Sequence, residues 1–320
     1  MTGELPADRD EGPRPPFPDL SRVSGAPTTR FAPSPTGRLH LGHLLNALYV
    51  WGIARATGGA VVLRVEDHDR QRSRHEHEAD MLDDLDRLGL QPDRPGTDDL
   101  RAGPSPYRQG DDDRPYAAAI ATLAASGLLY RCECSRADLA GWAGGHGRVA
   151  DGPGCPGACR DRSLPDAPHL ALRVALGGGV ESIDDLLAGP WSGPVAPGGD
   201  PVLRDRLGNW SYHLCVVVDD ARHGVDLVIR GRDLLDATPV QVRLRRALGM
   251  APIPTHLHHP LVLRADGTKL SKANDDTAIR ELLDAGVRPA ELFGMAAAAG
   301  GLRRDADPIE PDRLADLFRR

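Results

Sequence analysis

The segment "GTKLSKAN", residues 267–274, contains both lysines of the chain, Lys269 and Lys272. All the other basic residues, out of 39 in total, are arginines. Arginine presents a wide planar fork, whereas lysine carries a compact point charge on a flexible stem. A point charge can follow a phosphate group through a displacement reaction, so we expect this loop to contact a phosphate. The alternative is a solvated hairpin with two lysines by chance.

A second stretch with possible chemistry is "RFAPSPTGRLHLGH", residues 30–43. Its prolines and glycine predict an irregular loop before a helix, whose N-terminus favours an anion. His40 and His43 are three residues apart and therefore share a face of the first turn, where imidazoles can donate to phosphate oxygens. Gly42 between them lets a flat ring approach the backbone. From spacing alone, the alternative is a capped helix with two surface histidines.

A third group consists of cysteines. Four of the five lie within 28 residues of a Gly- and Pro-rich stretch, at Cys132, Cys134, Cys155 and Cys159. Zinc favours four thiolates in a tetrahedron, and such a site can hold together a module that has little core. We therefore predict one structural Zn2+ per chain. The alternative is a set of small buried apolar side chains, which is how we interpret Cys215 within "LCVVV".

The whole chain limits the class of protein. Its 320 residues are enough for one large domain or two to three small modules. The net charge of −7 argues against a protein held to nucleic acid by bulk charge alone, although the arginines can still form a local groove. The sequence shows no secretory signal and no apolar run of membrane-spanning length. We expect a cytoplasmic monomer with reduced cysteines.

The elements that must position these residues alternate between strands and helices. We expect a short strand and turn over 28–34, a helix from Leu41, a buried strand over 60–67, a helix that ends at Gly89 and another over about 115–129. A second α/β stretch covers "YHLCVVVDDA", "VDLVIRG" and "TPVQVRLRRALG". This alternation predicts a parallel sheet with nucleotide-sized crevices at the strand C-termini.

Taken together, these motifs resemble those of the class I aminoacyl-tRNA synthetases. "HLGH" is similar to the HIGH motif and "KLSKA" to the KMSKS motif, and "RFAPSPTG", "RVEDHDRQR", "VVVDD" and "VIRGRDLL" are similar to the glutamate-specific branch. The resemblance covers about residues 28–275. It implies a Rossmann-like α/β catalytic domain that uses ATP with Mg2+. It also implies catalytic roles for His40, His43, Lys269 and Lys272, with Gly42 at the ATP and Lys272 on the pyrophosphate leaving group.

The resemblance also implies a glutamate pocket. Such a pocket needs cations for the side-chain carboxylate and an anion for the ammonium group, and bidentate arginine suits a carboxylate. By resemblance, the side chain is held by Arg30, Tyr212 and Arg230, and the amino end by Ser34 and Glu66. The full predicted set is Arg30, Phe31, Ala32, Pro33, Ser34, Glu66, Tyr212 and Arg230. Taken singly, each would be interpreted as a surface or salt-bridged residue. We interpret Asp219, Asp220 and the histidines of "THLHHP" as structural or supporting groups.

Within the branch, the chain resembles the short glutamyl-Q tRNA(Asp) synthetases, which are paralogues of the catalytic half of glutamyl-tRNA synthetase. The full-length enzymes continue into a helical anticodon-binding region. Only 46 residues follow Asn274, fewer than the usual domain of about 100, so we expect no anticodon-binding domain. The resemblance implies activation of glutamate by ATP without tRNA and its transfer to the cyclopentenediol of queuosine in tRNA(Asp). The chain departs from the family at Cys155, where tyrosine is common, and at His43, where the family often has another residue.

The expected organisation has five parts. We expect a disordered extension over 1–27, the first half of the catalytic domain over 28–130, a zinc-binding insert over 131–168, a connecting region and the second half over 169–260, and the lysine loop with a short helical segment over 261–320. Two alternative functions remain open: a truncated glutamyl-tRNA synthetase that charges tRNA(Glu), and a catalytically silent, zinc-containing RNA-binding paralogue. Binding of ATP and glutamate would distinguish the last from the others.

Overall fold

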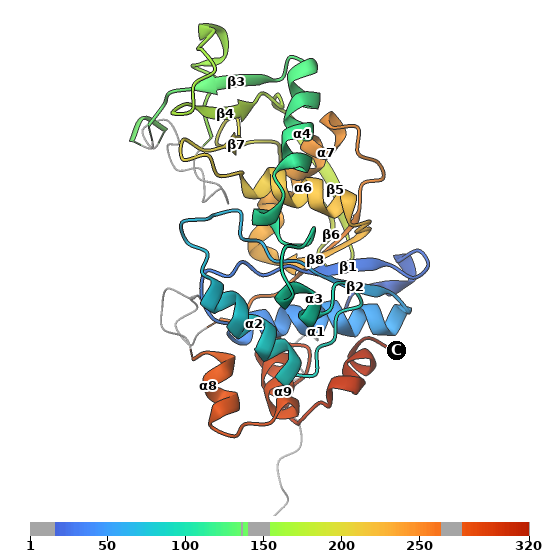
Figure 1. Cartoon of the computed structure of the whole chain (residues 1–320). Helices are drawn as coiled ribbons and strands as arrows, with labels where there is room; N and C mark the ends of the chain where they lie inside the picture. The colour runs from blue at the N-terminus through green and yellow to red at the C-terminus, as the bar shows by residue number, and fades with distance from the viewer. Residues whose placement is uncertain (1–16, 136, 140–153, 264–276, 320) are drawn as a thin grey trace, which may run out of the picture.

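The computed structural model describes residues 17–135, 137–139, 154–263 and 277–319. A central layer of strands is covered by helices on both sides, with a small antiparallel sheet at one end and the C-terminal helices at the other (Figure 1). The first half contains β1 (Thr28–Phe31), α1 (Leu41–Thr57), β2 (Ala60–Leu63), α2 (His75–Arg87), α3 (Thr97–Arg101), η2 (Gln109–Asp111) and α4 (Arg114–Ala125). The second half contains β5 (Val180–Asp185), β6 (Gly189–Pro194), α6 (Tyr212–Arg222), β8 (Leu227–Gly231), η4 (Arg232–Ala237), α7 (Thr238–Ala247) and β9 (Thr255–His259).

The strands of the two halves meet at β1 and β8. β1 pairs with β2 in parallel, and β8 pairs with β9 in parallel within the order β6-β5-β9-β8. The backbone N–H of Asp226 donates to the carbonyl of Thr28 at 3.1 Å, which brings β8 alongside β1. The predicted parallel sheet is therefore confirmed, and the carboxyl ends of β1, β2, β8 and β9 face one region.

Helix α1 is buried along most of its length because it lies between the sheet and the C-terminal helices (Figure 1). It begins at the N-cap His40 and ends at Gly58, which takes the left-handed conformation with φ 70°. Helix α2 is amphipathic instead: Met81, Leu82 and Leu85 are buried together with Glu78 and Asp84, while its other acidic residues are exposed or partly exposed. Both helices begin and end close to where the spacing of apolar residues predicts.

The C-terminal part is helical, as expected, with α8 (Ile279–Asp284), α9 (Pro289–Ala299) and η6 (Pro311–Phe318). Phe318 packs on Tyr49 of α1 with ring centroids 5.3 Å apart. Gly52 makes this contact possible, because a Cβ there would lie 2.4 Å from the Phe318 ring. The segment thus forms part of the core of the catalytic half.

Residues 17–27 do not form the disordered segment that the sequence predicts for 1–27. They include η1 (Leu20–Arg22), and the ring of Phe17 lies 6.1 Å from that of Phe318. The backbone N–H of Asp19 donates to the carbonyl of Leu186 at 3.1 Å. Phe17 and Leu20 pack against the main core, which fixes this segment along the body of the protein.

The region of the predicted zinc insert is built on a three-stranded antiparallel sheet of β3 (Leu129–Cys132), β4 (Ala171–Val174) and β7 (Val202–Arg204), with η3 (Arg160–Arg162) beside it. The sheet uses strands on both sides of the predicted 131–168 boundaries, so the insert shares its framework with the following region. Asp200 joins its parts: it accepts from the Tyr130 hydroxyl at 2.8 Å and from Arg160 at 2.5 and 2.6 Å.

Candidate active site

A cavity of about 490 Å³ opens at the carboxyl ends of the central strands. Residues from the loop after β1, the start of α1, the segment after β2, the end of β8 and the segment after β9 form its walls. Nine of the predicted site residues line it: Arg30, Ala32, Ser34, His40, Gly42, His43, Glu66, Tyr212 and Arg230. This is the position at which open α/β sheets bind their ligands.

The two histidines at the start of α1 cap the helix and face the cavity. The Nδ1 of His40 accepts from the backbone N–H of Gly42 at 3.1 Å, and the Nδ1 of His43 accepts from the backbone N–H of His40 at 3.1 Å. A neutral imidazole that accepts at Nδ1 carries its proton at Nε2. The rings lie 3.9 Å apart. The prediction of a shared face is correct, and both rings are set as Nε2–H donors at the positive end of a helix.

Gly42 favours this arrangement. A Cβ at this position would lie 3.0 Å from Cε1 and 3.1 Å from Nδ1 of His40. Those atoms belong to the capping ring itself, so a side chain would press on the ring and shift it. The glycine therefore preserves the orientation of His40, in addition to leaving the cavity open.

A buried chain of charges fixes the floor of the cavity. Oδ1 of Asp220 accepts from Arg30 Nε at 3.1 Å and from Arg64 Nη1 at 2.7 Å. Arg64 in turn donates to Glu66 Oε1 at 2.8 Å. Burial alone would raise the pKa of Asp220, but Arg30 and Arg64 outweigh it and lower the pKa to about 2. Asp220 therefore stays ionised and positions Arg30, and Arg64 holds Glu66 at the cavity.

Arg230 and Tyr212 face Arg30 from the second half of the fold. Arg230 is the last residue but one of β8 and is 4% exposed. Its Nη1 donates to the Tyr212 hydroxyl at 3.3 Å, which brings a guanidinium and a phenol to the same wall. One cavity thus receives the guanidinium groups of Arg30 and Arg230, the hydroxyl of Tyr212 and the carboxylate of Glu66. Such a set can bind a molecule that carries both a carboxylate and an ammonium group.

Some predicted residues do not reach the cavity. Phe31 and Pro33 do not line it. Phe31 is buried in the core, edge-on to Trp51, and its carbonyl accepts from the backbone N–H of Arg64 at 3.0 Å. The Pro33 carbonyl accepts from the backbone N–H of Glu66 at 3.2 Å, so both residues shape the site through their backbones. Lys269 and Lys272 lie outside the described residues.

Other residues line the cavity without having been predicted. His68 follows Glu66 by two positions, and its Nδ1 lies 2.8 Å from Oε1 of Gln109. Asn46, Asp233 and His259 also line the cavity, from α1, η4 and the end of β9. For His68 in "RVEDHD" and His259 in "THLHHP", the one available signal of a place in the site was their position at the carboxyl end of a strand.

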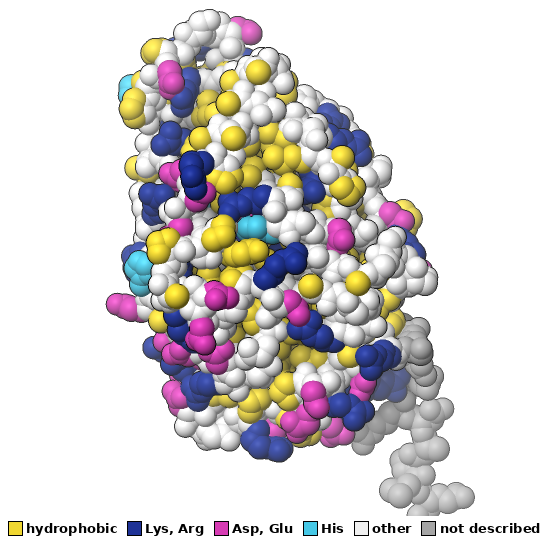
Figure 2. Space-filling model, turned by 45° about the vertical axis from the view of Figure 1, so that its right-hand side comes forward, with side chains coloured by type: hydrophobic (Ala, Val, Ile, Leu, Met, Phe, Trp, Pro, Cys, Tyr) yellow, Lys and Arg dark blue, Asp and Glu magenta, His cyan; other side chains and the backbone are white. Residues whose placement is uncertain are grey.

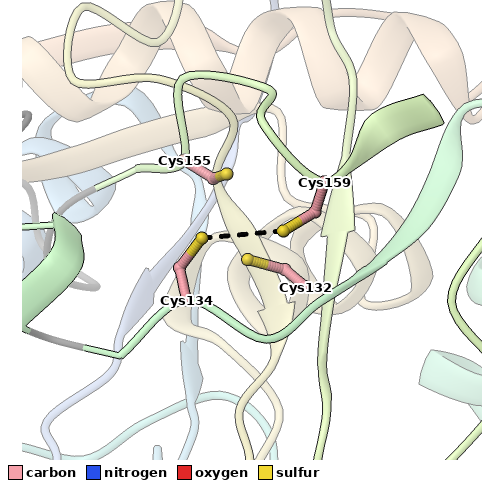
Figure 3. A group of neighbouring side chains, drawn as sticks. All are labelled: Cys132, Cys134, Cys155 and Cys159. Atoms are coloured by element: carbon pink, nitrogen blue, oxygen red, sulfur yellow. Dashed lines mark hydrogen bonds between the residues drawn. The ribbon is translucent and has the colours of Figure 1, made fainter. Parts of the chain in front are cut away.

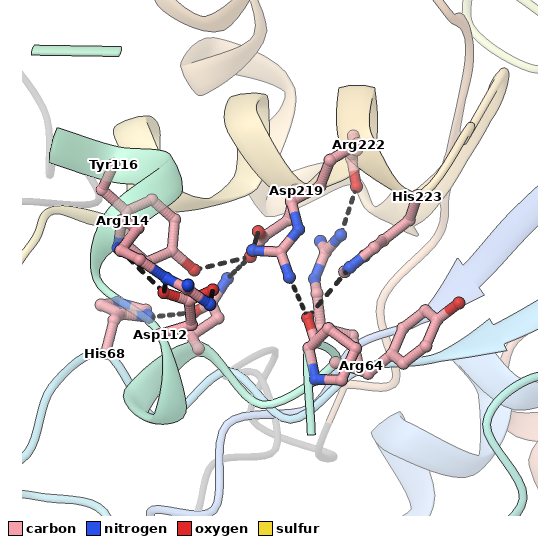
Figure 4. A network of polar contacts seen from close by, with 12 residues as sticks. Arg64, His68, Asp112, Arg114, Tyr116, Asp219, Arg222 and His223 are labelled. Carbon is pink, nitrogen blue, oxygen red and sulfur yellow. Dashed lines mark hydrogen bonds and ion pairs between the residues drawn. The ribbon is translucent and has the colours of Figure 1, made fainter. Parts of the chain in front are cut away.

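A network of polar contacts that includes Tyr116 and Asp219 lies beside His68 (Figure 4). The Gln109 side chain connects His68 to it. The Nε2 of Gln109 donates to Asp219 Oδ2 at 2.8 Å, and the Tyr116 hydroxyl donates to the same oxygen at 2.9 Å. Burial raises the pKa of Asp219. The network ties α6 to the segment that carries His68, in agreement with the supporting role expected for Asp219.

The four predicted cysteines converge on one point (Figure 3). Their sulfur atoms all lie within 4.8 Å of one another, and the sulfurs of Cys134 and Cys159 are 3.6 Å apart. Zinc–sulfur bonds of about 2.3 Å in a tetrahedron place sulfurs about 3.8 Å apart. The spacing therefore fits a tetrahedral zinc ion, and the group can hold one. Burial raises the pKa of the Cys132 thiol, so a thiolate there needs a cation to stabilise it.

The surface charge is mixed. On the face shown in Figure 2, basic and acidic side chains alternate around a central area with arginine or lysine, histidine and apolar side chains. Among the described residues, no helix is both long and apolar enough to cross a membrane.

Comparison with known proteins gives a consistent result. The model of the catalytic domain of class I tRNA synthetases for glutamate and glutamine matches residues 27–145 and 178–301. The chain is 41% identical over 298 residues to a protein named glutamyl-Q tRNA(Asp) synthetase from Symbiobacterium thermophilum, with 90% of this chain and 91% of that protein covered. A protein of the same name from Nitratidesulfovibrio vulgaris is 39% identical over 297 residues, with the same coverage.

A solved structure adds support for the fold. A glutamate tRNA ligase from Elizabethkingia meningosepticum, crystallised in complex with its amino acid, superimposes with a TM-score of 0.71 at 25% identity. The match covers 92% of this chain, which spans 65% of the length of that ligase.

Proposed function

The chain belongs to the glutamyl-Q tRNA(Asp) synthetase family of class I aminoacyl-tRNA synthetases, and from this premise we propose that it activates glutamate with ATP in the absence of tRNA and transfers the glutamyl group to queuosine in tRNA(Asp). The observation that carries the proposal is the convergence of Arg30, Arg230, Tyr212 and Glu66 with the two capping histidines on one cavity. The arginines suit the side-chain carboxylate, and Glu66 suits the ammonium group.

The first step forms glutamyl-adenylate. An oxygen of the α-carboxylate of glutamate attacks the α-phosphorus of ATP, and the bond from that phosphorus to the bridging oxygen breaks to release pyrophosphate. The Nε2–H groups of His40 and His43 donate to phosphate oxygens from the helix N-terminus. Lys272 stabilises the leaving pyrophosphate, and Mg2+ bound with ATP would neutralise part of the phosphate charge. The chain thereby contributes positioning and charge stabilisation.

The second step passes the glutamyl group to a hydroxyl of the queuosine cyclopentenediol in tRNA(Asp), with release of AMP. We assign this acceptor because the relatives named glutamyl-Q tRNA(Asp) synthetase match this chain over 91% of their own length. A zinc ion held by the cysteine cluster would stabilise the region around β3, β4 and β7 and supplies no chemistry to either step. Part of the same proposal is a cytoplasmic enzyme, because ATP and tRNA are its substrates.

The test is exchange of labelled pyrophosphate into ATP with glutamate as the amino acid. We expect exchange without any tRNA, none with glutamine, and a larger loss of exchange than of glutamate binding in Lys272→Ala. Exchange that requires tRNA(Glu) would instead support ordinary charging. No exchange under either condition would refute adenylate formation and support a silent RNA-binding paralogue.

A further inference from the structure

Arg230 makes an unusual set of contacts for a buried cation. Its Nε donates to His258 Nε2 at 3.0 Å, its Nη1 to Tyr212 and to Gln241 Oε1 at 2.7 Å, and its Nη2 to Thr238 Oγ1 at 2.7 Å. Every one of these partners in the described part of the chain is a neutral group. An arginine has five N–H donors, so one donor on Nη2 remains for a ligand. A buried guanidinium that contacts no carboxylate attracts an anion.

His258 can accept from Arg230 in one tautomer alone. Since its Nε2 receives the Arg230 donor, its proton lies on Nδ1, and Nδ1 donates to Asp185 Oδ2 at 2.7 Å. Both side chains are completely buried. Burial lowers the pKa of His258, so the ring is neutral. Asp185 thus selects the tautomer that Arg230 requires.

Asp185 is itself held firmly. Its Oδ1 accepts from the backbone N–H groups of Leu187 and Ala188, at 2.9 and 2.7 Å, and its Oδ2 accepts from the backbone N–H of His258 at 3.0 Å. Burial alone would raise the pKa of Asp185, but the hydrogen bonds from His258 and from these backbone groups outweigh it and lower the pKa. The carboxylate is therefore ionised and cannot rotate without losing several bonds.

We propose that Asp185 and His258 are positioning residues that hold Arg230 as the receptor for the side-chain carboxylate of glutamate and so determine the selection of glutamate over glutamine; this inference rests on the proposed function. Asp185 stabilises the guanidinium through the ring of His258, and no carboxylate of the described residues contacts the guanidinium itself. Arg30 differs, because its Nε contacts Asp220 directly at 3.1 Å.

The selection follows from donor and acceptor matching. The remaining N–H of Arg230 meets an acceptor oxygen when the ligand ends in a carboxylate. Arg30 also keeps donors for the ligand, because its hydrogen bonds within the described chain are from Nε to Asp220 and from Nη1 to the carbonyl of Ile229. A carboxylate can accept from both arginines with its two oxygens. An amide has one oxygen, so its NH2 group faces the donors of one arginine, which leaves polar groups unpaired. This discrimination between a carboxylate and an amide depends on the orientation of the Arg230 guanidinium, which the Asp185–His258 pair fixes.

Two substitutions of His258 separate positioning from simple packing. In His258→Gln, the amide oxygen takes the place of Nε2 and can still accept from Arg230. In His258→Asn, the amide lies at the level of Nδ1, so it can donate to Asp185 but cannot reach Arg230. We expect His258→Asn to raise the Kd for glutamate about 10- to 100-fold, the loss that follows when one hydrogen bond to a charged group is removed. His258→Gln should bind glutamate nearly as well as the unsubstituted protein.

The matched control is His256→Asn. His256 lies two residues earlier on β9, is buried, and stacks on His258 with ring centroids 6.0 Å apart. It does not line the cavity. This substitution should therefore leave the affinity for glutamate unchanged, even if it lowers stability to the same extent.

Binding of glutamate and of glutamine is measured by calorimetry, in parallel with pyrophosphate exchange and thermal unfolding. Equal losses in His258→Gln and His258→Asn, or an unchanged ratio of glutamate to glutamine affinity in His258→Asn, would overturn the inference. If His258→Asn does not fold, Asp185→Asn is measured in its place. An amide NH2 at this position donates to Nδ1 of His258 and so moves the ring proton to Nε2, where it opposes Arg230. This variant should lower the affinity for glutamate in the same way. If the unsubstituted protein binds glutamate but shows no exchange, the proposed reaction fails while the inference about Arg230 is still tested.

Discussion

Asp220 joins three parts of the fold, and its removal should be costly in a predictable way. Its carboxylate contacts Arg30 from β1 and Arg64 from the segment after β2, and the three side chains are at most 6% exposed. The pKa falls from 3.8 to about 2. At about 1.4 kcal/mol per pKa unit, this difference stabilises the ionised form in the folded protein by about 2.5 kcal/mol.

Asp220→Asn keeps the shape and removes the charge. Breaking a buried ion pair by removing one partner costs about 3–5 kcal/mol, because the other charge is left uncompensated. Arg64 keeps its contact with Glu66, so we expect the lower end, a decrease of about 3 kcal/mol in the free energy of unfolding. A carboxylate with a lowered pKa stabilises the fold above its unfolded pKa, and this contribution is lost only as pH falls towards 2. The decrease should therefore be constant between pH 5.5 and 8.

Urea unfolding of the two proteins at several pH values measures this decrease. The control is Asp219→Asn at the neighbouring position, where Gln109 and Tyr116 donate to Oδ2 and an amide can replace part of these contacts. Its one cation within 4 Å in the described chain is the partly exposed Arg222, 3.3 Å from Oδ1, and such a pair contributes little. It should lower the free energy of unfolding by no more than about 1.5 kcal/mol. Equal losses in the two variants, or a loss in Asp220→Asn that disappears above pH 6, would refute the account of Asp220 as the charge that compensates two arginines.

Three further predictions concern other parts of the molecule. Chelation of the metal or Cys134→Ser should abolish a zinc content of one per chain and lower the thermal unfolding temperature, since a structural zinc site contributes directly to folding. Burial raises the pKa of Asp84 to about 6 although Arg280 Nη2 lies 3.3 Å from its Oδ1, and its oxygens accept no hydrogen bond in the described structure, so Asp84→Asn should increase the free energy of unfolding at pH 7.5 by about 1–2 kcal/mol in urea titrations. Burial lowers the pKa to about 3 in His223 and His256 and to about 4 in His259. The unfolded chain then binds more protons, so stability should fall below pH 6.5 by up to about 4 kcal/mol per pH unit, and a flat pH dependence between 6.5 and 5 would contradict this.

Much of the catalytic half could be predicted from sequence because its signals are local. The apolar spacing from Leu41 and around Met81 predicts α1 and α2, and the four cysteines predict the cluster that the structure brings together. Local pattern is less informative in "YHLCVVVDDA", where a short apolar run fits a strand or a buried helix equally well. The structure shows α6, which begins at the N-cap Ser211, whose side chain accepts from the backbone N–H of Leu214.

The remaining features depend on long-range contacts that no local pattern contains. Arg64 is buried beneath the site and is paired with Asp220, which lies 156 residues further along the chain. No local pattern around Arg64 indicates this partner. The hydrogen-bonded series Asp185–His258–Arg230 joins β5, β9 and β8. Each of these residues alone is an ordinary polar residue in the sequence. Phe31 and Pro33 were predicted from a motif, yet they contribute through their backbones. Sequence therefore identifies the wall of the cavity better than the groups that support it.

We propose that glutamate passes to queuosine and not to the 3′ end of the tRNA. The most direct measurement is transfer of labelled glutamate to tRNA(Asp) from which the 3′-terminal adenosine has been removed, with and without queuosine in the anticodon. We predict acceptance by the truncated, queuosine-bearing tRNA at the level of the intact molecule, and none by tRNA that carries guanosine in place of queuosine. Transfer that requires the terminal adenosine and ignores queuosine would contradict the claim.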